Sequence, residues 1–222
     1  MARLAAADSA TPLPLDPTEP RLIPGKPAPA PITPEDRARF SHKGQFGLSM
    51  RMGLGVRAIA TYDDTVYCGT TDTSVTTQNA PVCSGRAPFE LGFEVSYGVT
   101  KRLDAFLEAD FAVEHDFGAS ATSLVTGPHP VRLSPGARFF FSDGKQSKLF
   151  TTAQVVFDFS GYKDISNKDR GNDIGVRNLD GFWIDFTHDY GAYVYVGDTL
   201  TFARWLEIGF EVWLGIQGRF GH

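Results

Sequence analysis

Five stretches of the chain alternate apolar and polar residues over ten or more positions, and turns or polar loops separate them. In the clearest stretch every second residue is apolar: Phe46, Leu48, Met50, Met52, Leu54, Val56, Ala58, Ala60 and Tyr62. A period of two is typical of a β-strand with two different faces. Ordinary strands have about 5–6 residues, whereas a tilted strand needs about 9–11 residues to cross a bilayer. The pattern therefore favours a transmembrane β-barrel.

We predict eight strands from this alternation, at 45–62, 89–97, 103–116, 131–141, 149–159, 174–186, 190–197 and 205–220. The connections after the first, third and fifth strands are long, and those after the second, fourth and sixth are short. Long extracellular loops and short periplasmic turns are typical of outer-membrane barrels. The predicted fold is all-β, an eight-stranded antiparallel up-and-down transmembrane β-barrel with a Pro-rich N-terminal tail and both chain ends in the periplasm.

The region 174–198 leaves the strand count open between seven and eight. Asn178 and Asp180 interrupt the apolar face there, which we interpret as a β-bulge near 179–181. If 180–197 were one long strand, the barrel would have seven strands. Bacterial single-chain barrels have even strand counts, and this favours eight.

The first 34 residues hold nine of the 14 prolines, which is typical of an extended linker or a disordered tail. Thr33 and Pro34 form a helix start, because Thr caps well and Pro suits the first helical position. We predict a Pro-rich periplasmic tail over 1–43, loose rather than spanning the periplasm, with a short helix near 34–40, and a barrel over 44–222. No signal peptide is visible at 1–7, so we expect the chain to be a mature or trimmed form.

Alternation alone does not say which face is outward, because a soluble lipocalin-like barrel has the same period with its apolar face inward around a hydrophobic ligand. All seven lysines fall outside the predicted strands, although a water-facing strand surface normally carries Lys. The polar face instead carries Arg, Asp and Glu, which form multiply bonded pairs in a confined interior. This favours apolar faces toward lipid, and dependence on detergent separates the two interpretations. The aromatic residues toward the strand ends are typical of interfacial girdles: Phe46, Tyr62, Phe89, Tyr97, Phe139, Phe141, Phe157, Phe159, Tyr190 and Phe220.

An eight-stranded barrel is just wide enough for side chains to fill it. We therefore predict a lumen plugged by charged side chains, with no solute channel. The predicted lumen charge network consists of Arg51, Arg57, Glu90, Glu94, Glu108, Arg132, Arg138, Asp158, Glu207 and Glu211. The full polar face has ten acids against six arginines, so four acids are expected to lack an Arg partner.

Two cysteines, Cys68 and Cys83, lie in one polar stretch and predict a disulfide at the base of a loop, which requires an oxidising compartment. Two cysteines without nearby His do not predict a zinc site. The net charge of −5 argues against a nucleic-acid partner.

Few residues suggest chemistry. A lipid-modifying enzyme would need Ser, His and an acid near the outer leaflet, and the candidates are His115, Asp116, His129 and Ser134, of which the two histidines could also share a metal. An oxygen-rich loop holds Asp164, Asn167, Asp169, Asn172 and Asp173, but its spacing does not match an EF-hand. We expect no catalytic residues, no metal and no cofactor.

The chain resembles small outer-membrane β-barrel proteins of the OmpA/OmpX type and uncharacterised barrels of the myxobacterial type. The segments that carry this resemblance are 134–143, 156–162, 175–178 and 215–220, and it extends over about 44–222. The resemblance implies an outer-membrane location, a lipid bilayer environment and no catalytic residues. The alternating terminal strand that ends at Phe220 resembles the signal read by the barrel-insertion machinery, although Gly221 and His222 follow. A structural or surface-interaction role follows, through extracellular loops whose partner the sequence does not identify.

Overall fold

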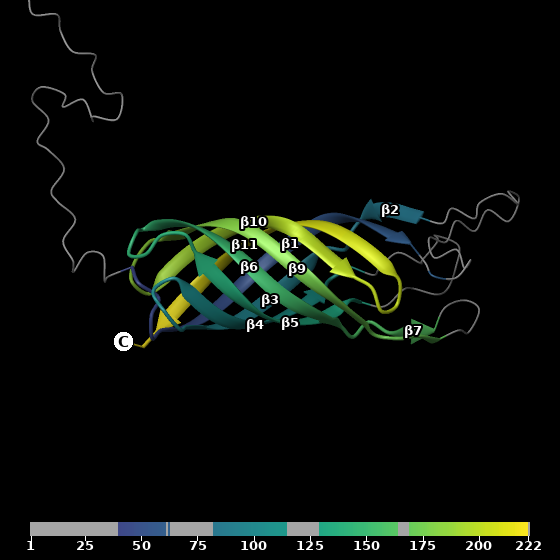
Figure 1. Cartoon of the computed structure of the whole chain (residues 1–222), viewed down its shortest axis with the longest axis horizontal. Coiled ribbons are helices and arrows are strands. Elements are labelled where there is room, and N and C mark those ends of the chain that lie inside the picture. The colour runs from purple at the N-terminus through teal and green to yellow at the C-terminus, as the bar shows by residue number, and fades with distance from the viewer. Residues whose placement is uncertain (1–39, 61, 63–81, 115–128, 164–168, 222) are drawn as a thin grey trace, which may run out of the picture. The chain divides into compact units, whose positions relative to one another are not determined.

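The computed structural model describes residues 40–60, 62, 82–114, 129–163 and 169–221 (Figure 1). The predicted short helix and almost all of the Pro-rich tail lie outside these residues. So does the predicted disulfide, since Cys68 and the side chain of Cys83 are not described. The described residues include no helix long and apolar enough to cross a membrane.

Eight antiparallel strands form a closed barrel: β1 (Phe46–Ala60), β3 (Glu90–Gly98), β4 (Leu103–Ala112), β5 (Val131–Phe140), β6 (Ser147–Asp158), β9 (Asp173–Asp185), β10 (Tyr190–Thr201) and β11 (Leu206–Phe220). Each strand pairs with the next along the chain, and β1 pairs with β11 from Phe46↔Phe220 to Ala60↔Leu206, which closes the wall. The prediction of eight strands in an up-and-down barrel is confirmed.

Three short strands in the described residues lie outside the barrel wall. β2 (Val82–Arg86) pairs with the last third of β1, beyond Gly53, which is the last residue of β1 that pairs with β3. β7 (Tyr162–Lys163) and β8 (Asp169–Arg170) form a separate small ladder. All three belong to the connections between barrel strands and lie at one end of the barrel (Figure 1).

The connections alternate in length as predicted. Short turns at 99–102, 141–146 and 186–189 lie at the end where β1 begins and β11 ends, which is the predicted periplasmic end. The strand ends joined by the connections 61–89, 113–130 and 159–172 lie at the opposite end, which is the predicted extracellular end. The fourth extracellular connection, 202–205, is short.

The predicted β-bulge near 179–181 is wrong. β9 pairs residue by residue with both neighbours, from Asp158↔Asp173 to Ser147↔Ile184 on one side and from Thr201↔Gly175 to Gly191↔Asp185 on the other. Asn178 and Asp180 therefore keep the alternation and point outward, in register with Val176 and Phe182.

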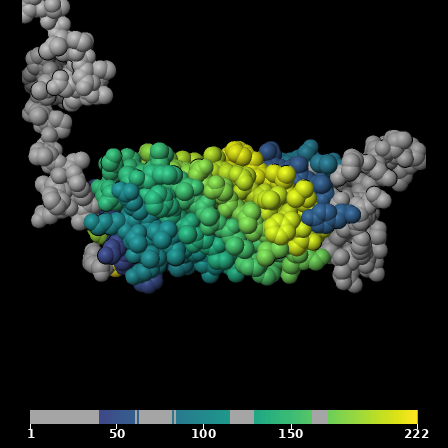
Figure 2. Space-filling view, viewed as in Figure 1, coloured from purple at the N-terminus to yellow at the C-terminus, as the bar shows by residue number. Residues whose placement is uncertain are grey.

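The apolar faces of the strands point outward. Leu48 and Met50 on β1 and Leu214 and Ile216 on β11 expose 54%, 52%, 56% and 62% of their surface. The charged alternate residues are buried inside, as the burial pattern of β11 shows. In a lipocalin-like barrel the apolar face would be inward, so this arrangement contradicts the soluble alternative. Figure 2 shows the outer surface as a continuous wall of packed side chains.

Aromatic residues lie near both ends of the outer surface. Phe46, Tyr97, Tyr190 and Phe220 are exposed at the periplasmic end, and the rings of Phe46 and Tyr97 lie 4.9 Å apart. Two members of the predicted girdles, Phe89 and Phe157, are only half-exposed. Aromatic side chains at these levels suit the two membrane interfaces.

The prediction that every lysine lies outside the barrel strands is wrong for Lys148. Lys148 was expected in a turn, yet it is the second residue of β6 and its side chain is buried inside the barrel. β6 begins at Ser147, two residues before the predicted start. The inward-pointing Lys148 continues the alternation, although a lysine was not expected inside the barrel.

Candidate functional site

The candidate functional site is the barrel interior, and its periplasmic end is organised around Asp185 at the end of β9. Lys148 Nζ lies 2.8 Å from Asp185 Oδ2 and also donates to the backbone carbonyl of Phe40 at 2.5 Å. Arg219 pairs with the other carboxylate oxygen, to which the indole N–H of Trp183 donates at 2.6 Å. Two cations and an indole N–H therefore satisfy one buried acid. Lys148 also connects the segment before β1 to this group of side chains, which is called the floor of the barrel.

His42 extends this floor toward the opposite wall. Its Nδ1 forms a hydrogen bond with Asp104 Oδ2 at 3.0 Å, and its Nε2 lies 2.9 Å from Lys148 Nζ. The imidazole packs edge-on against Phe140, with ring centroids 4.6 Å apart. Together these contacts close the periplasmic end with side chains from β4, β5, β6 and the residues just before β1.

A layer of aromatic side chains lies above the floor. Trp183, Tyr193 and Tyr195 form a stack, with ring centroids separated by 4.8 and 5.6 Å. Arg138 lies over Trp183 at 5.1 Å and donates to Glu94 Oε2 at 2.5 Å. A guanidinium over aromatic faces gains cation–π stabilisation while its hydrogen bonds stay with the carboxylate. This layer fills the interior with large rigid rings.

Ion pairs cross the lumen above the aromatic layer. Arg177 Nη1 on β9 lies 2.5 Å from Glu108 Oε1 and 3.0 Å from Asp110 Oδ2, both on β4. Arg51 on β1 pairs with the same two acids, at 2.7 Å from Asp110 Oδ1. Strands β5 and β6 separate β4 from β9, so these contacts join distant parts of the wall rather than neighbouring strands.

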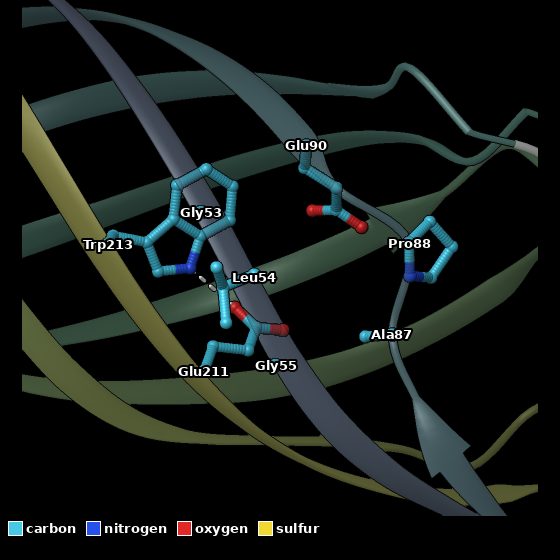
Figure 3. Close-up of a pocket in the computed structure, with 8 residues that line it drawn as sticks. All are labelled: Gly53, Leu54, Gly55, Ala87, Pro88, Glu90, Glu211 and Trp213. Carbon is cyan, nitrogen blue, oxygen red and sulfur yellow. Dashed lines mark hydrogen bonds between the residues drawn. The ribbon is translucent and has the colours of Figure 1, made fainter.

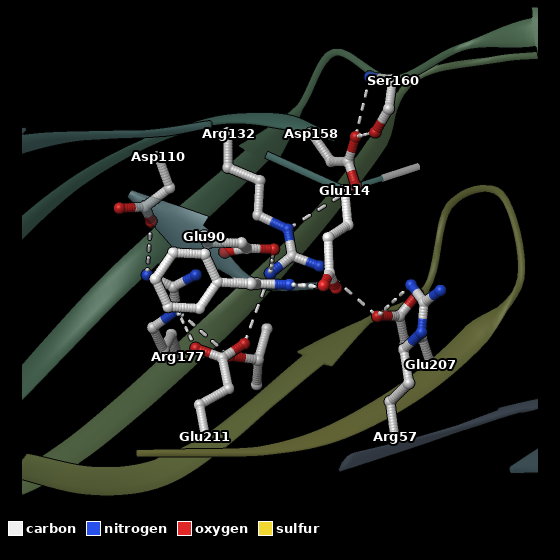
Figure 4. A network of polar contacts seen from close by, with 12 residues as sticks. Arg57, Glu90, Asp110, Glu114, Arg132, Asp158, Ser160, Arg177, Glu207 and Glu211 are labelled. Carbon is white, nitrogen blue, oxygen red and sulfur yellow. Dashed lines mark hydrogen bonds and ion pairs between the residues drawn. The ribbon is translucent and has the colours of Figure 1, made fainter. Parts of the chain in front are cut away.

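Arg132 is the centre of the upper network (Figure 4). Its guanidinium lies within ion-pair distance of four carboxylates, at 3.3 Å from Glu90 and Glu211, 3.5 Å from Glu207 and 3.7 Å from Asp158. Glu207 also pairs with Arg57 at 3.4 Å. One planar cation with several donors can hold several acids together in a way that a Lys ammonium cannot.

The extracellular mouth is closed by Asp173 and Arg204. Asp173 accepts hydrogen bonds from the backbone N–H groups of Ala203 at 2.6 Å and Arg204 at 3.1 Å, and from the Thr201 hydroxyl at 3.0 Å. Arg204 lies 3.4 Å from Asp158 and stacks on Trp205 at 4.0 Å. Asp173, a member of the oxygen-rich loop, thus orders the short 202–205 connection.

The structure brings all ten residues of the proposed lumen charge network into the interior, where each is buried. Glu94 pairs with Arg138 in the aromatic layer, and the other eight lie in the two upper groups around Arg177 and Arg132. Sequence reasoning missed Lys148, Asp173, Trp183, Tyr193, Tyr195, Arg204 and Trp213, which also line or close the interior. The alternation itself contained the signal for Trp183 and Trp213, which have the same strand parity as Asp185 and Glu211.

A small cavity opens where β1 leaves β3, beside Glu90 and Trp213 (Figure 3). Its volume is about 10 Å³, room for about a single water molecule. Neither carboxylate oxygen of Glu90 has a hydrogen-bond partner among the described residues, although Arg132 lies nearby. A water in this cavity would satisfy Glu90, so the cavity suits a structural water rather than a substrate.

The residues considered for catalysis do not form a site among the described ones. Ser134 is fully buried on the inward face of β5, opposite Glu108. His129 lies before β5 at the rim, where its Nδ1 is 3.2 Å from the carbonyl oxygen of Ala112. His115, Asp116, Asp164 and Asn167 lie outside the described residues. No group of three or more potential metal ligands occurs in the part of the chain that is described.

Two surface ion pairs lie at opposite ends of the barrel, outside the wall. The guanidinium of Arg86 donates to Glu114, and the N–H of Phe89 donates to the same carboxylate at 3.1 Å, so the pKa of Glu114 is lowered from its ordinary value. At the periplasmic end, Arg102 lies 3.4 Å from Asp143 and lowers the pKa of that carboxyl. The first pair fastens β2 to the segment after β4.

The chain is similar to solved structures of outer-membrane barrels. Neisserial surface protein A (NspA) matches 80% of this chain and 100% of its own, with a TM-score of 0.55 and 12% identity. The N-terminal β-barrel domain of Pseudomonas aeruginosa OprF covers 80% and 98% (TM-score 0.48, 12% identity), and Ail of Yersinia pestis covers 80% and 99% (TM-score 0.49, 9% identity). No protein-family model matches the sequence, and no characterised protein matches it.

The likeness to NspA shows the fold of a small outer-membrane barrel. The outward apolar faces and the closed hydrogen-bonded wall are what a bilayer requires, since a closed barrel leaves no strand edge in lipid. The chain therefore has the fold of a small outer-membrane barrel, an eight-stranded closed wall with its apolar faces outward, as predicted.

Proposed function

We propose that the protein is a closed outer-membrane barrel without enzymatic activity, which acts at the cell surface through its extracellular end. The observation that carries the proposal is the set of ion pairs between opposite walls, above all Arg177 with Glu108 and Arg132 with Glu211. These side chains are buried and mutually paired, and an eight-stranded barrel has little interior width to spare. The lumen then acts as a structural plug and not as a path for solutes.

The extracellular end is the part of the molecule left to interact. Three of its four connections, at 61–89, 113–130 and 159–172, are much longer than the periplasmic turns. β2 extends the β1 edge beyond β3, and the Arg86–Glu114 pair fastens it there. We infer that these connections contact a partner outside the cell or support the envelope.

Electrical recording in planar bilayers tests the closed lumen. The purified protein in phosphatidylcholine bilayers should give no steady conductance steps. The fourfold variant Glu108→Ala, Arg132→Ala, Arg177→Ala, Glu211→Ala removes both cross-lumen ion pairs, and it too should give no steady steps, because the aromatic layer of Trp183, Tyr193 and Tyr195 still fills the lumen. Steady conductance of the unmodified protein would overturn the plug.

Cysteine labelling of intact cells tests the orientation. In a background of Cys68→Ser and Cys83→Ser, Asn172→Cys should react with a membrane-impermeant maleimide on intact cells. The matched variant Asp143→Cys, at the opposite turn, should react only after lysis, since both residues are exposed but lie at opposite ends. The reverse pattern would overturn the assignment of the long connections to the cell surface.

The absence of enzymatic activity is tested separately. Incubation with vesicles of phosphatidylethanolamine and phosphatidylglycerol should release no fatty acid above the background of empty detergent. Release that Ser134→Ala or His129→Ala abolishes would overturn this part of the proposal and favour a lipid-modifying enzyme.

The barrel-insertion machinery is the second proposed partner. Support comes from β11, which alternates without interruption from Leu206 to Phe220 and presents Phe220 outward with 55% of its surface exposed. Phe220→Ser should lower the yield of inserted, heat-modifiable protein in cells, while Phe202→Ser in an extracellular connection should not. Equal insertion of the two variants would contradict this role for the terminal aromatic residue.

A further inference from the structure

The outward faces of the eight barrel strands carry charged residues at one place only. Asp180 on β9 and Asp198 on β10 are exposed, and every other charged residue on these eight strands points inward. Asn178, also exposed, lies two residues from Asp180 on the same face. A surface that is otherwise apolar, small or hydroxyl-bearing is thus interrupted by two carboxylates and an amide.

These residues form one continuous patch across three adjacent strands. Asn178 is the direct cross-strand partner of Asp198, and Asp180 is the direct partner of Thr151 on β6. The Thr151 hydroxyl donates to the Asn178 side-chain oxygen at 3.3 Å. Neither Asp180 nor Asp198 has a hydrogen bond or ion pair with another described residue.

The patch lies at membrane depth. β9 has 13 residues, and Asp180 is five positions from its periplasmic end and seven from its extracellular end. Asp198 lies three positions from the extracellular end of the 12-residue β10. Polar side chains that face hydrocarbon lose their hydrogen bonds to water, so they occur rarely and usually face a polar partner.

A shallow groove of about 520 Å³ adjoins Asp180. Its walls are the apolar side chains of Phe141, Leu149, Phe182, Val194 and Val196, and Gly181, Phe150 and Tyr195 also line it. A carboxylate beside an apolar hollow can receive a cationic head together with the apolar stem that carries it.

We propose that the outward face of β9 and β10 binds a second, membrane-embedded polypeptide, which inserts an Arg or Lys side chain against Asp180 and Asp198 and packs apolar residues into the groove. The negative charge of the patch favours a cationic partner, and the position of Asp180 between the two ends of β9 favours a partner inside the membrane. A lipid amine lies at headgroup level, above Asp180. The outward strand faces of a second copy offer no cation, so self-contact through these faces would bring like charges together.

The test uses a defined probe in vesicles. A hydrophobic transmembrane peptide with one central Arg and a dansyl label is reconstituted with the full-length protein in phosphatidylcholine, and energy transfer from the tryptophans measures association. A peptide with Leu in place of the Arg is the comparison. The Arg peptide should associate about tenfold more tightly, which is within the gain that polar contacts between model transmembrane peptides give.

Asp180→Asn with Asp198→Asn should remove this preference, and Asp189→Asn, the same change in an exposed turn, should preserve it. Heat-modifiable migration of each variant verifies that it is folded. Equal binding of the two peptides, or a preference that survives Asp180→Asn with Asp198→Asn, would overturn the proposal. A wild-type dimer in sedimentation that this double variant dissociates, together with equal peptide binding, would assign the patch to a second copy instead.

Discussion

Arg177 on β9 and Glu108 on β4 meet across the lumen, with Nη1 2.5 Å from Oε1 and neither side chain exposed. β5 and β6 lie between the two strands in the wall, so the contact spans the interior. Glu108 also pairs with Arg51, and Arg177 also pairs with Asp110. Three strands are thereby linked through side chains alone, which gives the barrel a polar core in place of an apolar one.

Replacement of Arg177 by Met should strongly destabilise the barrel. The change leaves Glu108 and Asp110 with one cation fewer in a buried site, and loss of one partner of a buried pair costs about 3–5 kcal/mol. The free energy of unfolding, measured by urea titration in phospholipid vesicles, checks this value. Arg102→Met, which breaks an exposed pair with Asp143, should leave the urea midpoint unchanged within error.

A second substitution distinguishes charge from packing at the same place. Glu108→Gln in the Arg177→Met background removes one of the two acids that then share Arg51 and should recover part of the lost stability. Identical stabilities of Arg177→Met and the double variant would mean that Arg177 acts through packing and not through its charge.

The glycines on the inward faces of β1 and β11 differ in the space around them. A Cβ at Gly53 would lie 2.2 Å from the ring of Trp213, whereas one at Gly209 would meet its nearest atom at 3.8 Å. Gly53→Ala should therefore cost about 1–3 kcal/mol through overpacking. Gly209→Ala should be neutral or slightly stabilising, by up to about 1 kcal/mol, because it restricts the unfolded chain.

Unfolding by urea in vesicles compares the two variants directly. The fluorescence of Trp213 reports whether its ring has moved in Gly53→Ala. If Gly53→Ala is as stable as Gly209→Ala, Trp213 can shift without loss and the interior is less tightly packed than the contacts indicate.

Much of the fold could be predicted because side-chain alternation and strand geometry share the same period. Leu48 and Arg51 point to opposite faces whatever the rest of the chain does, so the faces of β1 follow from local sequence. The same rule holds for Asn178 and Asp180, which keep the alternation of β9. The predicted bulge is wrong because the polar side chains of these two residues were interpreted as an interruption of the strand. Their polarity changes the outer surface of the barrel and leaves the backbone pairing regular.

The partners inside the lumen could not be predicted in the same way. Arg132 contacts Glu211 and Arg138 contacts Glu94, and these pairs depend on strand tilt and on the register that closes β1 against β11. Alternation gives the face of each residue but not its height in the barrel. The surplus of acids in the lumen is also smaller than expected. Lys148 and Arg204, which the sequence placed in turns, pair with the buried acids Asp185 and Asp158.

The protein should require detergent for extraction and should shift mobility on boiling. The outward faces of β1 and β11 expose large apolar side chains along their whole length, which is unfavourable in water. Electrophoresis in SDS with and without heating checks this expectation, because a closed barrel resists SDS until it is boiled. Protein that is soluble without detergent and shows no shift would contradict the bilayer-spanning barrel.

The Arg86–Glu114 pair predicts a pH dependence confined to the extracellular end. The hydrogen bond from Arg86 lowers the pKa of Glu114, so the pair is stabilised in full above the ordinary pKa of Glu and is lost as pH falls through the lowered value. Carbon-detected NMR titration in detergent micelles should give a Glu114 pKa below the ordinary value of a Glu carboxyl. Arg86→Ala should raise it toward that value without changing the pKa of Asp143, which Arg102 lowers at the other end of the barrel. Reciprocally, Arg102→Ala should raise the pKa of Asp143 alone. A Glu114 pKa that Arg86→Ala leaves unchanged would mean that Arg86 does not hold β2 against the segment after β4.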